Sequence, residues 1–179
     1  MKTTISTLAA AVVSAFVFMG GCVQKLTTVN MEYPTEATFQ TQILPTTGNQ
    51  SFGSVVLTSD LKNQLEKNNT SLDLLDELKL KSATISYSEK ADSAKNFNDV
   101  DAFEFWLSAD GLPTIKVASK NPVPDNSGVV TLDVSSNEDL VAYIKSNTFT
   151  YEVKGSNSAP LPVMNLKLKA VWNIKASAK

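Results

Sequence analysis

The sequence predicts an all-β fold, an antiparallel β-sandwich of immunoglobulin-like or jelly-roll type with about eight strands and one to three short helices. Apolar and polar residues alternate along most of the chain, which is the pattern of a strand with one buried face. Stretches rich in Gly, Pro, Asn and Asp separate the alternating segments, as expected of turns. Segments with helical spacing are too few to cover a parallel sheet. A barrel is the alternative, because alternation does not distinguish a closed sheet from two packed sheets.

The first strand is predicted at residues 29–43, either as one long strand or as two strands broken near Pro34. A proline removes one hydrogen bond from a strand ladder, so it marks an edge strand or a break. The apolar side chains at the odd positions are expected to face the core. They are Val29, Met31, Tyr33, Ala37, Phe39 and Ile43. Residues 48–53 have the composition of a turn, and residues 54–57 that of a short strand.

Two short helices are predicted between residues 59 and 78. Ser59 and Ser71 are the expected N-caps, because a serine hydroxyl accepts a hydrogen bond from a free amide at the start of a helix. The leucines that follow each serine have helical spacing. They are Leu61 and Leu65 in the first helix, and Leu72, Leu75 and Leu78 in the second.

Strand alternation returns after residue 80 and continues, with interruptions, to the end of the chain. A bulge is expected near residues 81–82, because the apolar positions change parity there. The later strands each carry an apolar row that is expected to face inward. These rows are Ala83, Ile85 and Tyr87; Val130, Leu132 and Val134; Phe149, Tyr151 and Val153; and Leu166, Leu168, Ala170, Trp172 and Ile174. Ser136 is expected to cap a helical turn that ends near Lys145.

A hairpin is predicted in the middle of the chain. Apolar and polar residues alternate within residues 101–108 and within residues 113–119. The pair Asp110-Gly111 between these segments favours a tight turn. The first of the two strands places its phenylalanines on one face and Trp106 on the other. The stretch PVPDNSG that follows has turn composition throughout.

Three stretches carry a resemblance of pattern to known proteins. They are FEFWLSADGLPTIKVAS, GVVTLDV and DLVAYIKSNTFTYEVKG. Together they resemble uncharacterised secreted β-sandwich proteins of bacterial envelopes, over roughly residues 79 to 175. The resemblance rests on no defining motif, so it implies the sandwich fold and implies no activity.

The N-terminus predicts a cleaved lipoprotein signal at residues 1–21. One lysine precedes an apolar run of signal-peptide length, and two glycines then lead to Cys22, the only cysteine. This order resembles the lipobox of bacterial lipoproteins, with Met19 at the position where Leu is usual. The resemblance implies cleavage before Cys22 and lipidation of its thiol, and two or three acyl chains suffice for stable anchoring. The alternative is a plain secretory signal in which the cysteine is coincidental.

The domain organisation and the location follow from this signal. Residues 22–28 are expected to be a tether and residues 29–179 a single β-sandwich domain held to the membrane through the lipid. The predicted location is the bacterial cell envelope. Val23 stands where an Asp is associated with inner-membrane retention in enteric lipoproteins, which favours the outer membrane.

The composition excludes several kinds of chemistry. All 16 basic residues are Lys, and the chain has no His, so bidentate anion recognition by Arg and catalysis by His are both missing. Acylation of Cys22 would leave no thiol for a disulfide, a nucleophile or a zinc site. The formal net charge of −2 shows no excess of positive charge of the kind that binds nucleic acid. We therefore expect no cofactor, no nucleic-acid partner and no enzymatic activity.

Trp106 is the best candidate ligand-binding residue. It lies opposite the inward phenylalanines of its strand, so an open outer face would let it stack on a sugar or meet a protein partner. The alternative is that Trp106 is covered, with the helix that carries Leu61 and Leu65 as the candidate cover.

The chain also contains three weaker motifs. Asn98, Asp99 and Asp101 provide closely spaced oxygen ligands for Ca²⁺ but lack EF-hand spacing, and an Asx-rich loop looks the same without metal. Ser59 and Lys62 match S-x-x-K at the frequency expected by chance, and the companion K-[ST]-G is absent. The stretch at residues 92–94 (DSA) resembles an O-glycosylation site of some Bacteroidetes.

These observations predict a lipid-anchored envelope protein that acts as a non-enzymatic binding or structural module of unknown ligand. The first alternative is a glycan-binding module that uses exposed aromatic residues. The second alternative is a hydrolase that uses carboxylates, such as Asp99 with Asp101, or the Ser/Lys pair.

Overall fold

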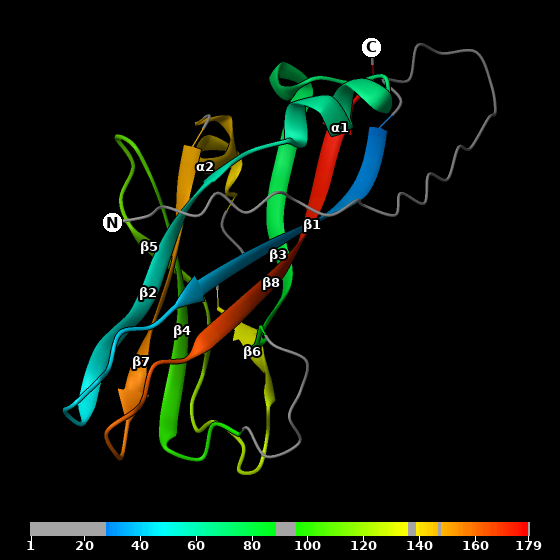
Figure 1. Cartoon of the computed structure of the whole chain (residues 1–179). Helices are drawn as coiled ribbons and strands as arrows, with labels where there is room; N and C mark the ends of the chain where they lie inside the picture. Colours follow the sequence, from blue (N-terminus) through cyan, green and yellow to red (C-terminus); the bar gives the residue numbers. More distant parts are fainter. Residues whose placement is uncertain (1–27, 89–95, 136–138, 147, 179) are drawn as a thin grey trace.

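The structure is a computed structural model that describes residues 28–88, 96–135, 139–146 and 148–178 (Figure 1). Eight strands account for most of this part of the chain. They are β1 (Thr28–Gln40), β2 (Gly48–Thr58), β3 (Leu75–Tyr87), β4 (Val100–Ala109), β5 (Ile115–Lys120), β6 (Val129–Val134), β7 (Thr148–Asn157) and β8 (Asn165–Ser177). The helical segments are α1 (Leu61–Lys67), the 3-10 turn η1 (Leu72–Leu74) and α2 (Val141–Lys145).

The strands form a single curled sheet in the order β1-β8-β3-β6-β5-β4-β7-β2. Every strand pairing is antiparallel. The link between β5 and β6 is short, with only Ala118 opposite Val134 and Ser119 opposite Asp133. The curl brings β1 and β2, the two ends of the order, into contact. The predicted all-β antiparallel class is therefore confirmed, in the form of a continuous curled sheet.

β1 is one unbroken strand, because Pro34 lies in an edge strand. β1 pairs only with β8, and Pro34 lies opposite Val171. A strand with one neighbour has a free side, where a missing N–H removes no ladder bond. The strand ends at Gln40, however, and Ile43 is 67% exposed. The prediction that Ile43 faces the core was wrong, because the chain has left the strand before it reaches this residue.

The second predicted helix is mostly strand. Only Leu72–Leu74 form a 3-10 turn, and Leu75 already belongs to β3. Register shifts in β3 occur between Leu75 and Glu77 and between Leu80 and Ser82. The first shift lets Leu75 and Leu78 face inward despite their opposite parity, which mimics helical spacing. The second shift confirms the bulge predicted at residues 81–82.

Residues 48–53 are also strand rather than turn. β2 begins at Gly48, and its register against β7 shifts between Ser51 and Gly53. Gly53 has φ +146°, a conformation that favours glycine. The turn-like composition therefore belongs to a bulged edge strand, and the bulge leaves Phe52 fully buried.

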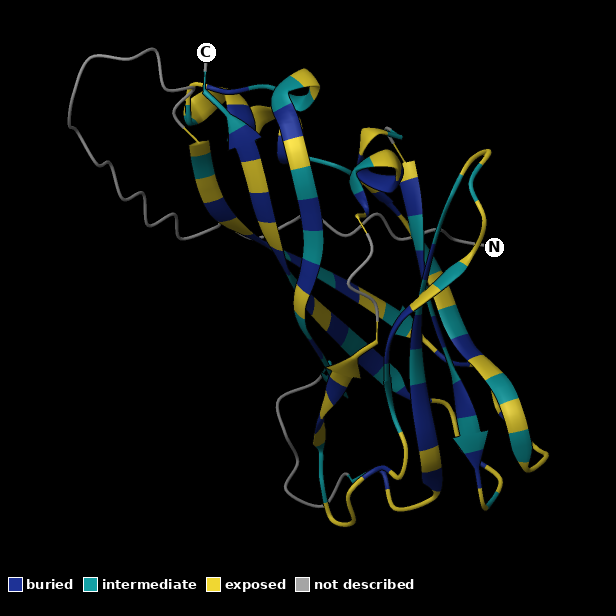
Figure 2. Ribbon diagram, turned by 180° about the vertical axis from the view of Figure 1, so that it is seen from behind, coloured by how far each residue is buried: buried dark blue, intermediate teal, exposed yellow. Residues whose placement is uncertain are grey.

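The inner side of the curled sheet holds the core, and burial alternates along the long strands (Figure 2). The inward rows predicted for β7 and β8 are confirmed, since all their members are at most 2% exposed. In β6, Val134 is 36% exposed, so its predicted inward position was wrong. This strand ends at Val134, beside the short link to β5.

Buried polar side chains join the two halves of the sheet, which are β1-β8-β3-β6 on one side of the β5–β6 link and β5-β4-β7-β2 on the other. Trp172 Nε1 in β8 donates to Thr35 Oγ1 at 3.1 Å and to the Tyr151 hydroxyl at 3.0 Å. The hydroxyls of Thr35 and Tyr151 share a hydrogen bond of 2.8 Å. Burial raises the pKa of Tyr151, so this hydroxyl stays neutral. Because Thr35 is in β1 and Tyr151 in β7, the network ties strands from opposite halves.

The molecule has two distinct ends (Figure 1). At one end, Thr28 pairs with Ser177, and α1 and η1 lie beside the C-terminus. Leu61 and Leu65 of α1 are fully buried there. The other end holds the start of β2, the start of β4 and the end of β7, where Asn157 pairs with Gly48 and with Val100.

Candidate functional site

Trp106 lies on the outer face of the sheet in β4, with charged side chains on both neighbouring strands. It lies opposite Lys116 of β5 and opposite Glu152 of β7. Glu104, two residues earlier on the same face, lies opposite Lys154. Side chains opposite each other on one face of a sheet are close enough to interact. The outward position predicted for Trp106 is therefore confirmed.

The Trp106 indole is half-buried beneath lysines rather than open. Its Nε1 donates to Glu104 Oε2 at 2.9 Å. Lys154 Nζ lies 4.9 Å from the ring centroid and Lys116 Nζ 5.9 Å, both within the range of cation–π attraction. α1 buries its leucines at the end of the core, so the cover is not the predicted helix. A ring stacking on this face of Trp106 would first have to displace Lys154.

Ion pairs fix the charged groups around the indole. Lys116 Nζ donates to Glu104 Oε1 at 2.9 Å, and Lys154 pairs with Glu152 at 3.2 Å. Partial burial acts to raise the pKa of Glu104, but hydrogen bonds from Lys116 and Trp106 and the charge of Lys154 outweigh it. The pKa of Glu104 is lowered as a result. At neutral pH this carboxylate is ionised and already bonded, which makes it a poor general acid.

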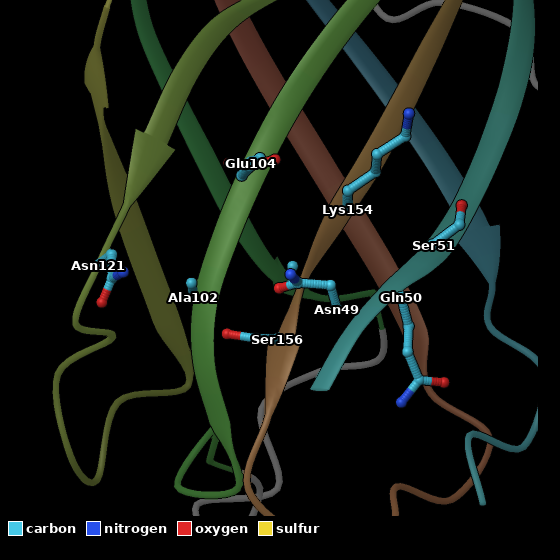
Figure 3. A pocket seen from close by; sticks show the side chains of 9 residues that line it. Asn49, Gln50, Ser51, Ala102, Glu104, Asn121, Lys154 and Ser156 are labelled. Carbon is cyan, nitrogen blue, oxygen red and sulfur yellow. The ribbon is translucent and has the colours of Figure 1, made fainter. Parts of the chain in front are cut away.

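A polar hollow of about 420 Å³ adjoins this cluster (Figure 3). It shares Glu104 and Lys154 with the cluster around the indole. The other polar side chains of its lining come from two strands and one loop. They are Asn49, Gln50 and Ser51 of β2, Ser156 of β7, and Asn121 after β5. Its volume lies within the range of small-molecule sites.

The strand register explains why the hollow exists. Asn49 lies opposite Ser156, and Ser156 lies opposite Ala102 of β4. Figure 3 shows the same order, with Ala102 between Asn121 on one side and Ser156 and Asn49 on the other. The small side chain of Ala102 leaves space in the middle of a row of longer side chains. The hollow is thus a gap in the outer face of three neighbouring strands, β2, β7 and β4, with Asn121 beside it after the end of β5.

The lining divides into side chains that are already bonded and side chains that are free to bind. Gln50 Nε2 donates to Asn157 Oδ1 at 2.7 Å and to the Thr46 carbonyl, and Ser51 donates to Glu152 at 3.0 Å. Three other lining residues form no side-chain hydrogen bond with the part of the chain that the structure describes. They are Asn49, Asn121 and Ser156.

The sequence did not reveal this hollow. Asn49 and Gln50 lie in a segment predicted as a turn, and the remaining residues are far apart in the sequence. Amides and hydroxyls of this kind are common on any surface, so composition alone does not mark them. Knowledge of the pairing of β2 with β7 and of β7 with β4 would have been needed to find it.

Asn98 and Asp99 of the predicted calcium ligands lie in the turn before β4, and Asp101 lies in β4 itself. Asn98 Oδ1 accepts a hydrogen bond of 2.6 Å from the Asn126 amide. The backbone carbonyls of Asp99 and Asp101 accept from the amides of Ser158 and Val123. No three His, Cys, Asp or Glu side chains converge as a metal site in the part of the chain that the structure describes. Calcium binding therefore stays an untested prediction.

The remaining predicted motifs have simple placements. The N-cap of α1 is Asp60, so the prediction of Ser59 as the cap was wrong by one residue, although Ser59 Oγ accepts a hydrogen bond of 3.1 Å from the Leu61 amide. Ser71 is the N-cap of η1 as predicted, but its side chain forms no capping hydrogen bond. Several predicted features lie outside the described residues. They are the signal at residues 1–21, Cys22, the tether except for its last residue Thr28, the glycosylation-like stretch at residues 92–94 and the cap Ser136. None of the described helices has the length and apolar character needed to cross a membrane.

No protein-family model matches this chain, and a search of curated proteins finds no similar sequence.

Proposed function

We propose that this chain is a lipid-anchored protein of the bacterial envelope that acts as a non-enzymatic binding module. The observation that carries the proposal is the polar hollow, with Asn49, Asn121 and Ser156 unengaged on a hydrogen-bonded sheet. A site on paired strands is held in a fixed geometry, which favours binding. Its two ionisable groups, Glu104 and Lys154, are held in ion pairs, which supports binding rather than acid–base catalysis.

The lipid anchor would leave the hollow facing away from the membrane. Five residues separate Cys22 from Thr28, and fully extended they and the flanking bonds span at most about 20 Å. The end of the domain with Thr28 and α1 would therefore lie near the bilayer. The hollow lies toward the opposite end, among the start of β2 and the end of β7 (Figure 1). Such an orientation suits contact with a partner beyond the membrane surface.

Cys22→Ala is expected to move the protein from the membrane fraction to the soluble envelope fraction, because the acylated thiol would be lost. Fractionation with immunoblotting measures the distribution, and incorporation of labelled fatty acid reports acylation. Met19→Leu is the matched control, since it restores the usual residue of the signal and should leave the protein in the membrane. An unsubstituted protein that incorporates no labelled fatty acid would exclude the anchor.

Ser156→Trp is expected to abolish retention by envelope material, because the indole would fill the hollow. The full chain with Cys22→Ala is sedimented with cell-wall sacculi or with outer-membrane vesicles from cells that lack the protein. Ser86→Trp, at an outward position of β3 opposite Lys167, is the matched control. Retention that Ser156→Trp leaves unchanged would disprove a binding role for the hollow.

A glycan-binding module is the second candidate function. The hollow lies directly beside the half-buried Trp106, with Glu104 and Lys154 belonging to both. Indole rings next to polar groups suit sugars, which have apolar faces and polar edges.

We also propose that the two halves of the curled sheet act as the two layers of a sandwich. Two observations support this description. The β5–β6 link between the halves has only two residue pairs, and Tyr151 of β7 bonds to Thr35 of β1 across the core.

A further inference from the structure

We propose that the hollow takes a neutral, polyhydroxylated ligand, a short glycan segment, and binds it through the edge formed by Asn49, Ser156 and Asn121. This inference rests on the proposed binding function and assigns its ligand class. It differs from a stacking mode, because Lys154 covers the indole of Trp106 at 4.9 Å.

The charges of the lining disfavour an ionic ligand. The lining contains one carboxylate, Glu104, and one ammonium, Lys154, so their formal charges cancel. Each is already neutralised, Glu104 by Lys116 at 2.9 Å and Lys154 by Glu152 at 3.2 Å. An anion would have to break the pair of Lys154, and no Arg is present anywhere in the chain to clamp it.

The unengaged groups match sugar hydroxyls. Each asparagine offers an amide with two N–H donors and one carbonyl acceptor, and Ser156 offers a hydroxyl that both donates and accepts. A sugar hydroxyl also donates and accepts, so a glycan can bond to all three without leaving a charge unpaired. Neutral groups cost less to desolvate than charged ones. The mixture of donors and acceptors is therefore better suited to a glycan than to a phosphate or a carboxylate.

The spacing suits more than one sugar ring. Asn49, Ser156 and Ala102 lie opposite one another on β2, β7 and β4, and Asn121 follows β5, the next strand. Three strand spacings of about 4.8 Å give the edge a length of about 14 Å. Because β2, β7 and β4 are hydrogen-bonded to one another, the backbone positions of Asn49 and Ser156 are fixed before the ligand arrives.

The test measures binding of neutral disaccharides to the full chain with Cys22→Ala. Nuclear magnetic resonance follows the side-chain amide signals of Asn49 and Asn121, with a panel of neutral disaccharides that includes N-acetylated ones. Shifts at these two amides are expected at millimolar concentration. Trp106 emission should change in parallel, because Trp172 is only 1% exposed.

Asn49→Ala and Asn121→Ala should each weaken binding by about two- to tenfold, the loss of one uncharged hydrogen bond. Asn173→Ala, on the exposed outer face of β8, is the matched control and should leave the affinity unchanged. Thermal unfolding of each variant checks that the fold is retained.

The outcomes separate this inference from the function on which it rests. Disaccharide binding that both asparagine variants weaken supports the glycan assignment. If no disaccharide shifts these amides while Ser156→Trp still abolishes retention by envelope material, the ligand class is wrong and the binding function stands. An anionic disaccharide that binds more tightly than its neutral counterpart would overturn the assignment too. If neither disaccharides nor envelope material bind, both proposals fail.

Discussion

Gly155→Ala is expected to lower the free energy of unfolding by about 3 kcal/mol or more, the upper end of the cost of overpacking. A Cβ at Gly155 would lie 1.9 Å from the carbonyl oxygen of Ala102 and 2.8 Å from Cε2 of Phe52. The carbonyl cannot move aside easily, because Gly155 pairs with Phe103 of β4 and with Gln50 of β2. The ring of Phe52 is fully buried and has no free space to enter. Urea unfolding monitored by circular dichroism measures the loss.

Gly111→Ala is the matched control for this substitution. Gly111 has φ +72° in the β4–β5 turn, and a Cβ there would meet nothing within 4 Å. Its replacement therefore adds only backbone strain, at about 1–2 kcal/mol. Equal losses for the two variants would mean that the close approach between β7 and β4 does not constrain the sheet.

Trp172→Ala is expected to cost about 3–5 kcal/mol, as removal of a large buried aromatic side chain does. The indole is 1% exposed and packs against Phe105 and Tyr151, with ring centroids 6.5 Å and 6.3 Å away. Its loss leaves a cavity between the halves of the sheet and removes the N–H that bonds to Thr35 and Tyr151. The midpoint of denaturant unfolding reports the effect.

Two further variants distinguish packing from hydrogen bonding. Trp172→Phe keeps most of the ring but removes the donor. It should lower the free energy of unfolding by about 1 kcal/mol beyond the loss caused by the smaller ring. The extra loss is no larger because Thr35 and Tyr151 still bond to each other. Trp106→Ala, which removes the half-buried outer tryptophan, should cost about 1 kcal/mol or less. A larger loss at Trp106 than at Trp172 would contradict the placement of the core.

The sequence predicted the elements whose pattern is local. Alternation alone identified the inward rows of β7 and β8, because each residue of a strand faces the opposite side from its neighbours. It also identified the turn at Asp110-Gly111 and the bulge after Leu80. It failed at Leu72, Leu75 and Leu78, where a register shift in β3 imitates helical spacing. A bulge changes parity without any compositional mark, so period alone cannot distinguish it from a helical turn.

The candidate site was predictable only in part. Trp106 was placed correctly on the outer face, because its parity is opposite to that of Phe103. The lysines that cover it depend on which strands flank β4, which is a matter of topology. The hollow depends on topology even more, since Asn49 and Ser156 are more than 100 residues apart in the sequence and meet through the β2–β7 register. Pairings of this kind are non-local, and alternation carries no information about them.

The pairing of β1 with β8 also bears on when the chain can fold. Thr28 lies opposite Ser177, so the first strand finds its only ladder partner in the last residues of the domain. Folds with such distant contacts form slowly, because a long loop must close before the contact stabilises it. The edge of the sheet that β1 forms on β8 therefore stays incomplete until the C-terminal strand has been synthesised, so the earlier strands must wait for it.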